Sequence, residues 1–249
     1  MIKAIFLDFY HTLVQFWPPL DQIQQASCRE MGLNVSEEGI NRGYAIADVY
    51  FNRENEIRPL AERSEKERSE FFAHYEQMIL ENAGVPVSLD LAAQIWKLAI
   101  AVPKDFIPYD DVIPALSELH QQGYRLAVLS NLRRDMSELC RHLGLAPYLD
   151  FYVSSAEVGA EKPHAAVFLA ALEKAAVAPG EVVHVGDQLR SDVVGARGVG
   201  IHPVLLDRGG WHQDIEDCAR IESLAQVRPL LVGAPSSLIS SNGNFPSLS

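Results

Sequence analysis

The opening segment, Met1–Val14 (MIKAIFLDFYHTLV), constrains the fold of this 249-residue chain more than any other. Its largely apolar run, Ile2–Leu7, ends abruptly at Asp8. A short apolar run is typical of a buried strand, and open α/β sheets bind their ligands at the carboxyl ends of the strands. The segment therefore predicts a buried first strand that delivers a carboxylate to a site at the edge of a sheet.

Apolar runs of strand length alternate with helical patterns along much of the remaining chain. The four further strand-like runs are Arg125–Ser130, Asp150–Ser154, Val182–Gly186 and Ile201–Leu206. Helical patterns lie between them at Val112–Gln122, Met136–Leu143 and Val167–Ala175. Because strands that alternate with helices form parallel sheets through right-handed crossovers, the sequence predicts an α/β fold with a doubly wound, Rossmann-like parallel sheet.

The stretch between the first two strands is too long and too helical for a single crossover. It has no convincing strand and contains four helical patterns, at Leu20–Met31, Glu37–Phe51, Ser64–Ala83 and Leu89–Ile100. We predict an inserted helical cap domain at residues 17–102 and a core domain at residues 1–16 and 103–232. Hinges are expected at Trp17–Pro19 and Val102–Lys104. Residues 233–249, rich in Ser, Pro, Gly and Asn, are predicted to be disordered.

Composition and charge narrow the classes of partner. A net charge of −12 argues against a nucleic-acid-binding surface and against a basic membrane anchor. No window approaches the roughly 20 apolar residues of a membrane span, and no basic segment leads into a long apolar one at the N-terminus. The three cysteines are too scattered for a disulfide framework or a metal site. We expect a cytoplasmic protein whose partners are neither nucleic acids nor membranes.

Polar residues follow three more of the predicted strands. Ser130 and Asn131 end the second, Lys162 follows the third, and Asp187 follows the fourth, with Asp192 shortly after it. A hydroxyl or ammonium group at such a position can bind a phosphoryl oxygen. Two carboxylates on one tight turn repel each other unless a cation lies between them, and such oxygen ligands suit Mg²⁺. Each residue also has a structural alternative: a helix cap for Ser130 or Asp192, and a solvated surface charge for Lys162.

Taken in order, these residues resemble the four signatures of the haloacid dehalogenase (HAD) superfamily. The first signature is usually Asp-x-Asp-x-Thr, and Asp8 and Thr12 match it with Tyr10 in place of the second aspartate. The helical insertion resembles the type 1 cap. His184–Asp187 (HVGD) is similar to the branch of the rhythmically expressed gene 2 product and its HAD-like hydrolase-domain relatives. The resemblance implies a hydrolase with a Rossmann-like core and an α-helical cap.

The resemblance also implies roles for individual residues. Asp8 would be the nucleophile, taking a phosphoryl group from a small phosphorylated metabolite as an aspartyl-phosphate. A Mg²⁺ cofactor would be bound by Asp8, the main-chain carbonyl of Tyr10, Asp187 and, directly or through water, Asp192. The transferring phosphoryl oxygens would be held by Ser130, Asn131 and Lys162. Because an anionic nucleophile meets an anionic phosphate only when cations neutralise them, the chemistry needs these positive groups.

Tyr10 limits how far the comparison extends. In the family, the aspartate at this position protonates the leaving oxygen and then activates water, a contribution of roughly 10²–10⁴-fold. A phenol with a pKa of about 10 is a poor substitute for a carboxylate with a pKa of about 3.9. His11 is a conceivable replacement because imidazole titrates near neutrality. However, adjacent side chains of an extended segment point apart, which argues against a catalytic role for His11.

Three functions therefore stay open. A Mg²⁺-dependent phosphatase with altered acid–base chemistry is favoured, because the metal-binding pair Gly186–Asp187 is intact. L-2-haloacid dehalogenases also have tyrosine two residues after the nucleophile, and they need neither the leaving-group acid nor the metal. The third function is a catalytically weak member that binds a phosphometabolite or a protein. The substrate and the oligomeric state are not specified by the sequence.

Overall fold

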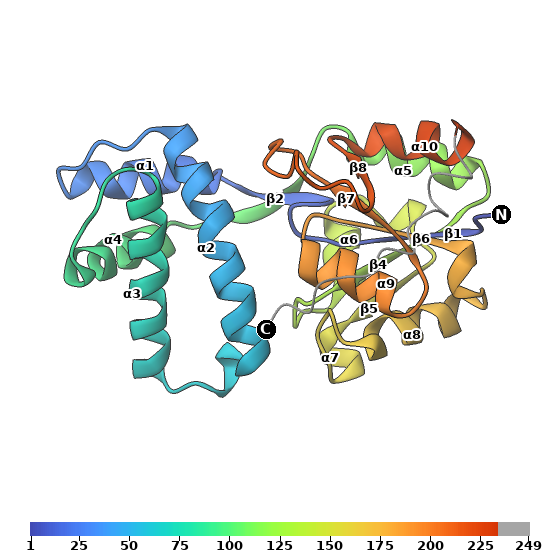
Figure 1. Cartoon of the computed structure of the whole chain (residues 1–249), viewed down its shortest axis with the longest axis horizontal. Helices are drawn as coiled ribbons and strands as arrows, with labels where there is room; N and C mark the ends of the chain where they lie inside the picture. Colours follow the sequence, from blue (N-terminus) through green and yellow to red (C-terminus); the bar gives the residue numbers. More distant parts are fainter. Residues whose placement is uncertain (234–249) are drawn as a thin grey trace. The chain divides into compact units, whose positions relative to one another are not determined.

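The computed structural model describes residues 1–233, which belong to two compact units of the chain (Figure 1). The first unit consists of Met1–Gln15 and the chain from Phe106 onward, and the second is Phe16–Asp105. The boundaries between these units fall close to the limits predicted for the cap, residues 17 and 102. Apart from Gly233, the predicted disordered tail lies outside the described residues.

A six-stranded parallel sheet organises the first unit, in the order β5-β4-β1-β6-β7-β8. Its strands are β1 (Ala4–Leu7), β4 (Arg125–Ser130), β5 (Phe151–Ser154), β6 (Val182–Gly186), β7 (His202–Leu206) and β8 (Ala219–Ile221). The chain builds outward from β1 on one side and then crosses to β6 on the other. The predicted doubly wound sheet is confirmed, with its topological switch point between β1 and β6, where such sheets bind ligands.

β1 is at the centre of this sheet because it is apolar on both faces. All four of its residues are buried, as expected for a parallel strand covered on each side. Leu7 pairs in register with Val128 of β4 and Val185 of β6, so these three strands end at the same edge. The next main-chain N–H, that of Asp8, donates to the carbonyl of Val185 at 2.9 Å. The register therefore carries Asp8 to the edge where Asp187 also emerges.

Helices cover both faces of the sheet (Figure 1). One face carries α5 (Val112–Gln121) and α10 (Val227–Gly233), and the other carries α8 (Ala165–Ala175) and α9 (Gly195–Gly198). Two short helices, α6 (Met136–His142) and α7 (Ser155–Val158), flank β5. The apolar stripe predicted for α8 is buried along its whole length, from Val167 to Ala175, in one core with β1 and β4. No helix in residues 1–233 is long and apolar enough to span a membrane.

Three short strands were not predicted. β2 (Val14–Trp17) and β3 (Asp105–Pro108) form a separate two-stranded sheet, and β8 is three residues long. β2 contains Gln15, β3 contains Asp105 and Pro108, and both strands are only partly buried, so neither forms an apolar run. β8 also contains Arg220, whose guanidinium pairs with the buried carboxylate of Asp207 at 3.0 Å. The position of β8 is thus fixed by its pairing with β7 and by the Arg220–Asp207 ion pair. Both are contacts between residues that are not neighbours in the sequence.

The second unit is helical, as predicted. Its helices are α1 (Leu20–Glu30), α2 (Glu37–Ile57), α3 (Glu65–Asn82) and α4 (Leu89–Ala101). The last three begin where the side chains of Ser36, Ser64 and Ser88 accept main-chain hydrogen bonds and cap the first turn. Gly43 lets α2 approach α3 closely, because a Cβ there would lie 2.2 Å from the carbonyl oxygen of Ile79.

Glu76 on α3 is a buried carboxyl in this helical unit. It has no solvent exposure, and its side chain contacts the side-chain amide of Gln24 on α1. Burial raises the pKa of Glu76 to about 8, with the Gln24 contact opposing the shift. Glu76 therefore keeps its proton at neutral pH in the folded state, whereas the unfolded chain releases it near pH 4.5.

We expect Glu76→Gln to stabilise the protein at pH 8 and to change little near pH 4.5. The stability that Glu76 contributes is complete below the unfolded pKa and is lost as the pH rises through the folded pKa. The gain at pH 8 is on the order of a few kcal/mol. Thermal unfolding across this pH range measures it, with the exposed Glu81→Gln on the same helix as a control. A Glu76→Gln effect that does not grow with pH would contradict the assignment.

Candidate active site

Three carboxylates meet at the carboxyl edge of the sheet. Asp8 follows β1, Asp187 follows β6, and Asp192 lies in a π-helical turn, Leu189–Val194. One oxygen from each lies within 4.8 Å of the others. The wide turn is a geometry that often occurs at functional sites. Residues separated by up to 184 positions are thus brought to the switch point of the sheet.

Lys162 lies between two of these carboxylates. Its Nζ is 2.5 Å from Oδ1 of Asp8 and 2.6 Å from Oδ1 of Asp192. Burial alone would lower the pKa of Lys162, but the two neighbouring carboxylates raise it above its ordinary value. The side chain is almost completely buried, so the alternative of a solvated surface lysine is wrong.

Asp192 uses both of its oxygens on protein donors. Oδ1 contacts Lys162 Nζ and, at 3.0 Å, His184 Nε2, while Oδ2 accepts the main-chain N–H of Gln188 at 3.0 Å. Burial would raise the pKa of Asp192, but the charge of Lys162 and the contact with His184 hold that pKa below its usual range. No role was predicted for His184 from the sequence. Its signal was a polar residue inside an apolar buried strand.

Asp187 is the carboxyl group of this cluster that the protein compensates least. Oδ1 of Asp187 is buried and has no hydrogen-bond partner among residues 1–233. Burial, with Asp8 and Asp192 nearby, raises the pKa of Asp187 well above its ordinary value. Burial also raises the pKa of Asp8 to about 6, although Lys162 opposes this shift. An oxygen-only set of three carboxylates facing one lysine fits a divalent cation such as Mg²⁺.

Ser130 and Asn131 reach the same edge from β4. The buried Ser130 hydroxyl accepts the main-chain N–H of Leu132 at 3.1 Å, which leaves its own proton to donate. The Asn131 side chain makes two hydrogen bonds to the main chain of Lys162, at 2.7 and 3.0 Å. Asn131 therefore fixes the main chain of Lys162. The substrate-binding roles of Ser130 and Asn131 stay predictions.

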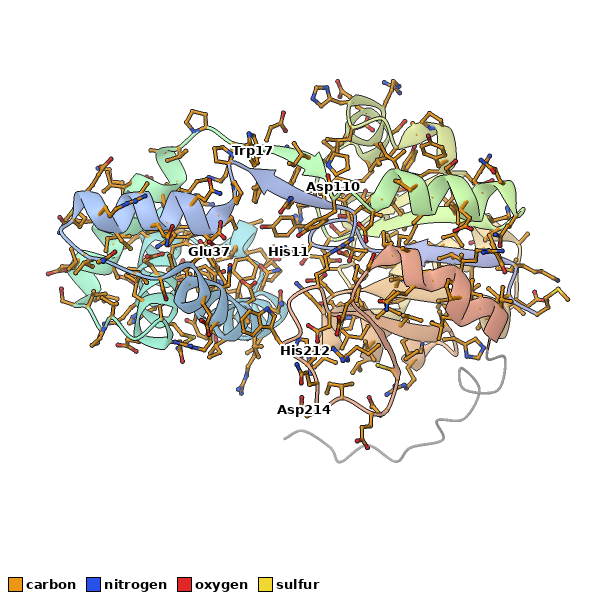
Figure 2. The ribbon with its side chains drawn as sticks, turned by 90° about the horizontal axis from the view of Figure 1, so that it is seen from above. His11, Trp17, Glu37, Asp110, His212 and Asp214 are labelled. Carbon is orange, nitrogen blue, oxygen red and sulfur yellow. The ribbon has the colours of Figure 1, made fainter. Side chains whose placement is uncertain are left out.

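Tyr10 and His11 do not point apart, and this part of the sequence interpretation is wrong. The segment is a turn rather than an extended chain, and His11 (labelled in Figure 2) has a left-handed backbone with φ 61°. The two ring centroids are 3.9 Å apart. Burial and the charge of Arg208 lower the pKa of His11 to about 4. The imidazole is therefore neutral at pH 7 and a weak base.

The haloacid dehalogenase-like hydrolase family matches residues 2–200. The chain belongs to this family. Among curated relatives, this HAD-like hydrolase is 30% identical to the glyceraldehyde 3-phosphate phosphatase of Methanopyrus kandleri, over 87% of this chain and 88% of that protein. It is 28% identical to the human haloacid dehalogenase-like hydrolase domain-containing protein 3, over 82% of each chain.

Solved structures share the fold of this HAD-like hydrolase. The crystal structure of a 2-haloacid dehalogenase from Pseudomonas syringae pv. tomato matches 93% of this chain and 98% of that chain, with a TM-score of 0.54 and 26% identity. The protein is therefore an enzyme of the HAD hydrolases, as its sequence motifs predicted. Because phosphatases and dehalogenases both resemble it, the reaction depends on the site rather than on the fold.

Gly186 is required by the close approach of Asp192. A Cβ at Gly186 would lie 2.2 Å from Cγ of Asp192. We expect Gly186→Ala to displace Asp192 and with it Lys162, lowering turnover by about 10²-fold and stability by about 1–3 kcal/mol. Gly198→Ala in α9 is the control, since no atom would lie within 4 Å of its Cβ. Steady-state kinetics and thermal unfolding measure both, and equal behaviour of the two variants would contradict the packing argument.

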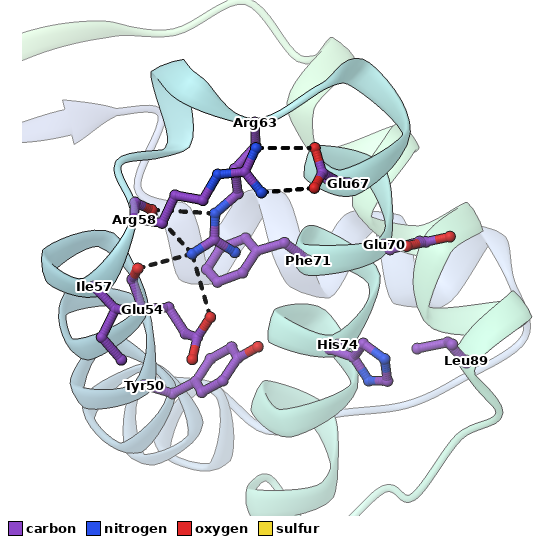
Figure 3. Close-up of a pocket in the computed structure, with 10 residues that line it drawn as sticks. All are labelled: Tyr50, Glu54, Ile57, Arg58, Arg63, Glu67, Glu70, Phe71, His74 and Leu89. Carbon is purple, nitrogen blue, oxygen red and sulfur yellow. Dashed lines mark hydrogen bonds and ion pairs between the residues drawn. The ribbon is translucent and has the colours of Figure 1, made fainter.

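The helical unit has a separate surface hollow of about 570 Å³ (Figure 3). It is lined by Tyr50 and by charged residues that already pair with one another. Arg58 pairs with Glu67 at 2.7 Å, and Arg63 pairs with Glu54 at 3.2 Å. Because its arginines are neutralised, this hollow offers no free positive charge from them to a phosphate.

Proposed function

We propose that this HAD-like hydrolase is a Mg²⁺-dependent phosphatase of small phosphate esters that works through an aspartyl-phosphate on Asp8. The observation that carries the proposal is a buried Asp187 oxygen with no hydrogen-bond partner in the described part of the chain, beside a nucleophile already paired with Lys162. Without a cation, the negative charge of these carboxylates is only partly neutralised. A bound cation would neutralise the remainder and allow an anionic phosphate to approach. The relative from Methanopyrus kandleri, named for its action on glyceraldehyde 3-phosphate, supports a small phosphorylated substrate.

In this reaction, a carboxylate oxygen of Asp8 attacks phosphorus, and the bond from phosphorus to the ester oxygen breaks. Lys162 orients Asp8 and neutralises charge on the phosphoryl oxygens, while the Ser130 hydroxyl donates to one of them. Asp192 holds Lys162 in place from its other side. Asp8, Asp187 and the main-chain carbonyl of Tyr10 would bind Mg²⁺, with Asp192 contributing directly or through water. When bound, the ion offsets the repulsion between carboxylate and phosphate.

Tyr10 predicts which substrates react fastest. The phenol can donate a hydrogen bond to a leaving oxygen, but it is a poor proton donor and a poor base for water. Esters whose leaving groups need no proton, such as aryl and acyl phosphates, are therefore the best substrates. Alkyl phosphates react slowly for the same reason.

A panel of aryl, acyl and alkyl phosphates, assayed with Mg²⁺ and with EDTA, tests this function. The expected result is phosphate release that depends on Mg²⁺, is abolished by chelation and returns when Mg²⁺ is added in excess. Undiminished turnover in EDTA would refute the proposal.

Dehalogenation is the second candidate, favoured by Tyr10 two residues after Asp8 and by the likeness to the Pseudomonas syringae dehalogenase. In that reaction Asp8 would displace halide from carbon, and no leaving-group acid is needed. Halide release from a panel of 2-haloacids in EDTA would establish this function, and its absence across the panel would exclude it for those substrates. The uncompensated Asp187 makes the phosphatase the better proposal.

A further inference from the structure

The residues that follow the nucleophile form a tight turn. Phe9 accepts main-chain hydrogen bonds from Leu13 at 2.8 Å and from Val14 at 3.1 Å, and His11 donates to the carbonyl of Val14 at 2.8 Å. This turn begins one residue after Asp8 and contains the Tyr10 carbonyl that the proposed function assigns to Mg²⁺. Its orientation therefore decides whether that carbonyl and the Asp8 carboxylate can reach one ion.

Arg208, which follows β7, contacts this turn although the two are far apart in the sequence. Its Nη2 donates to the carbonyl of Thr12 at 2.9 Å, and the same guanidinium makes two hydrogen bonds of 3.0 Å to the Asp111 carboxylate. The guanidinium also lies 4.1 Å from the centroid of the Tyr109 ring. A planar guanidinium group that makes hydrogen bonds on two sides and stacks on an aromatic ring is held in one position.

The neighbours of Arg208 hold the turn at two further points. The main-chain N–H of Tyr109 donates to the carbonyl of Leu13 at 3.1 Å, and its hydroxyl lies 3.4 Å from Nδ1 of His11. Asp111 is itself fixed by the Ser223 hydroxyl at 2.6 Å and by the main-chain N–H of Leu224 at 2.9 Å. Arg208 and Tyr109 thus connect three consecutive residues of the turn to the start of α5, and through Asp111 to the segment after β8.

We propose that Arg208 is a positioning residue that holds the Phe9–Val14 turn so that the Asp8 carboxylate and the Tyr10 carbonyl face the same Mg²⁺. This inference rests on the proposed function. It assigns to the connection after β7 a role in metal binding, although Arg208 is not itself a ligand. Outer residues that orient metal ligands typically change metal affinity by about 10–100-fold when they are replaced.

Arg208→Gln and Arg208→Lys test the inference, with Arg220→Gln as the matched control. Arg220 also pairs with a carboxylate, Asp207, at 3.0 Å, and its other partner is Glu222, so its ion pairs among residues 1–233 lie outside the Phe9–Val14 turn. Calorimetric titration with Mg²⁺ alone, without substrate, gives the metal affinity. Steady-state kinetics at saturating Mg²⁺ then separates kcat from KM for an aryl phosphate.

Arg208→Gln is expected to weaken Mg²⁺ binding by at least about tenfold and to lower kcat more than it changes KM. Arg208→Lys should recover part of the affinity, because an ammonium can donate to Thr12 or Asp111 but cannot reproduce the planar guanidinium group. Arg220→Gln should bind Mg²⁺ as the wild type does. If Arg208→Gln does not fold, Arg208→Lys decides by the same titration.

Two results would overturn the inference while the proposed function stands. One is wild-type Mg²⁺ affinity in the folded Arg208 variants, and the other is an equal loss in Arg220→Gln. A wild-type protein that neither binds Mg²⁺ nor releases phosphate would instead refute the proposed function and remove the basis of the inference.

Discussion

Asp8→Asn is expected to lower turnover of every phosphate ester by at least about 10⁴-fold, as the loss of a nucleophile does in other enzymes that form covalent intermediates. The amide has the size of the carboxylate but cannot attack phosphorus. The fold should persist. Burial raises the pKa of Asp8 from 3.8 to about 6, so the ionised group costs stability as the pH rises through that value. In the variant this gain is set against the loss of the buried Asp8–Lys162 ion pair, so thermal unfolding is measured beside turnover to show that the variant is folded.

Asp110→Asn is the matched control for this substitution. Asp110 (labelled in Figure 2) is exposed, lies in the same unit and is not one of the three carboxylates that meet at the edge of the sheet, so its replacement removes the same charge without changing that cluster. Its turnover should equal that of the wild type. Activity retained by Asp8→Asn, measured with an aryl phosphate and Mg²⁺, would show that another group is the nucleophile.

Tyr10→Asp is expected to raise the turnover of alkyl phosphates by roughly 10²–10⁴-fold, the usual contribution of a positioned general acid–base group. A carboxyl there can protonate the leaving oxygen and then activate water. Aryl phosphates should gain less in their first step, because their leaving groups need no proton. The ratio of kcat for an alkyl ester to kcat for an aryl ester is the measurement.

Tyr10→Asn controls for the loss of the ring. It removes the packing of Tyr10 against His11 and Phe106, whose centroids lie 3.9 and 5.8 Å away, just as Tyr10→Asp does. It supplies no carboxyl, so it should not raise the alkyl-to-aryl ratio. Equal ratios in the two variants would mean that the absence of an acid at this position is not what limits the reaction.

The fold was predictable where strands are long and buried. β4 and β6 have the residue bounds that their apolar runs predicted, and β1 begins two residues later than its run. Asp8, Lys162, Asp187 and Asp192 were identifiable because each follows a strand of one parallel sheet, so the topology alone brings them to one edge. The end of α2 was not predictable from its apolar stripe, since the helix continues to Ile57 through a polar segment.

The rest of the site depends on side-chain contacts and on a turn that no periodic pattern in the sequence indicates. Nothing near His184 or Arg208 in the sequence indicates that one binds Asp192 and the other binds Thr12. The conformation of His11 was mispredicted because a turn closed by its own hydrogen bonds interrupts what reads as an extended continuation of β1.

The aspartyl-phosphate is the central claim, and acid quenching within the first turnover tests it most directly. An acyl phosphate is mixed with enzyme and Mg²⁺, the reaction is stopped in acid, and the peptides are analysed by mass spectrometry. A single phosphoryl group on the peptide that contains Asp8, absent with EDTA and absent in Asp8→Asn, is the predicted result. Release of phosphate in that turnover with an unmodified Asp8 peptide, or with the label on another residue, would contradict the account.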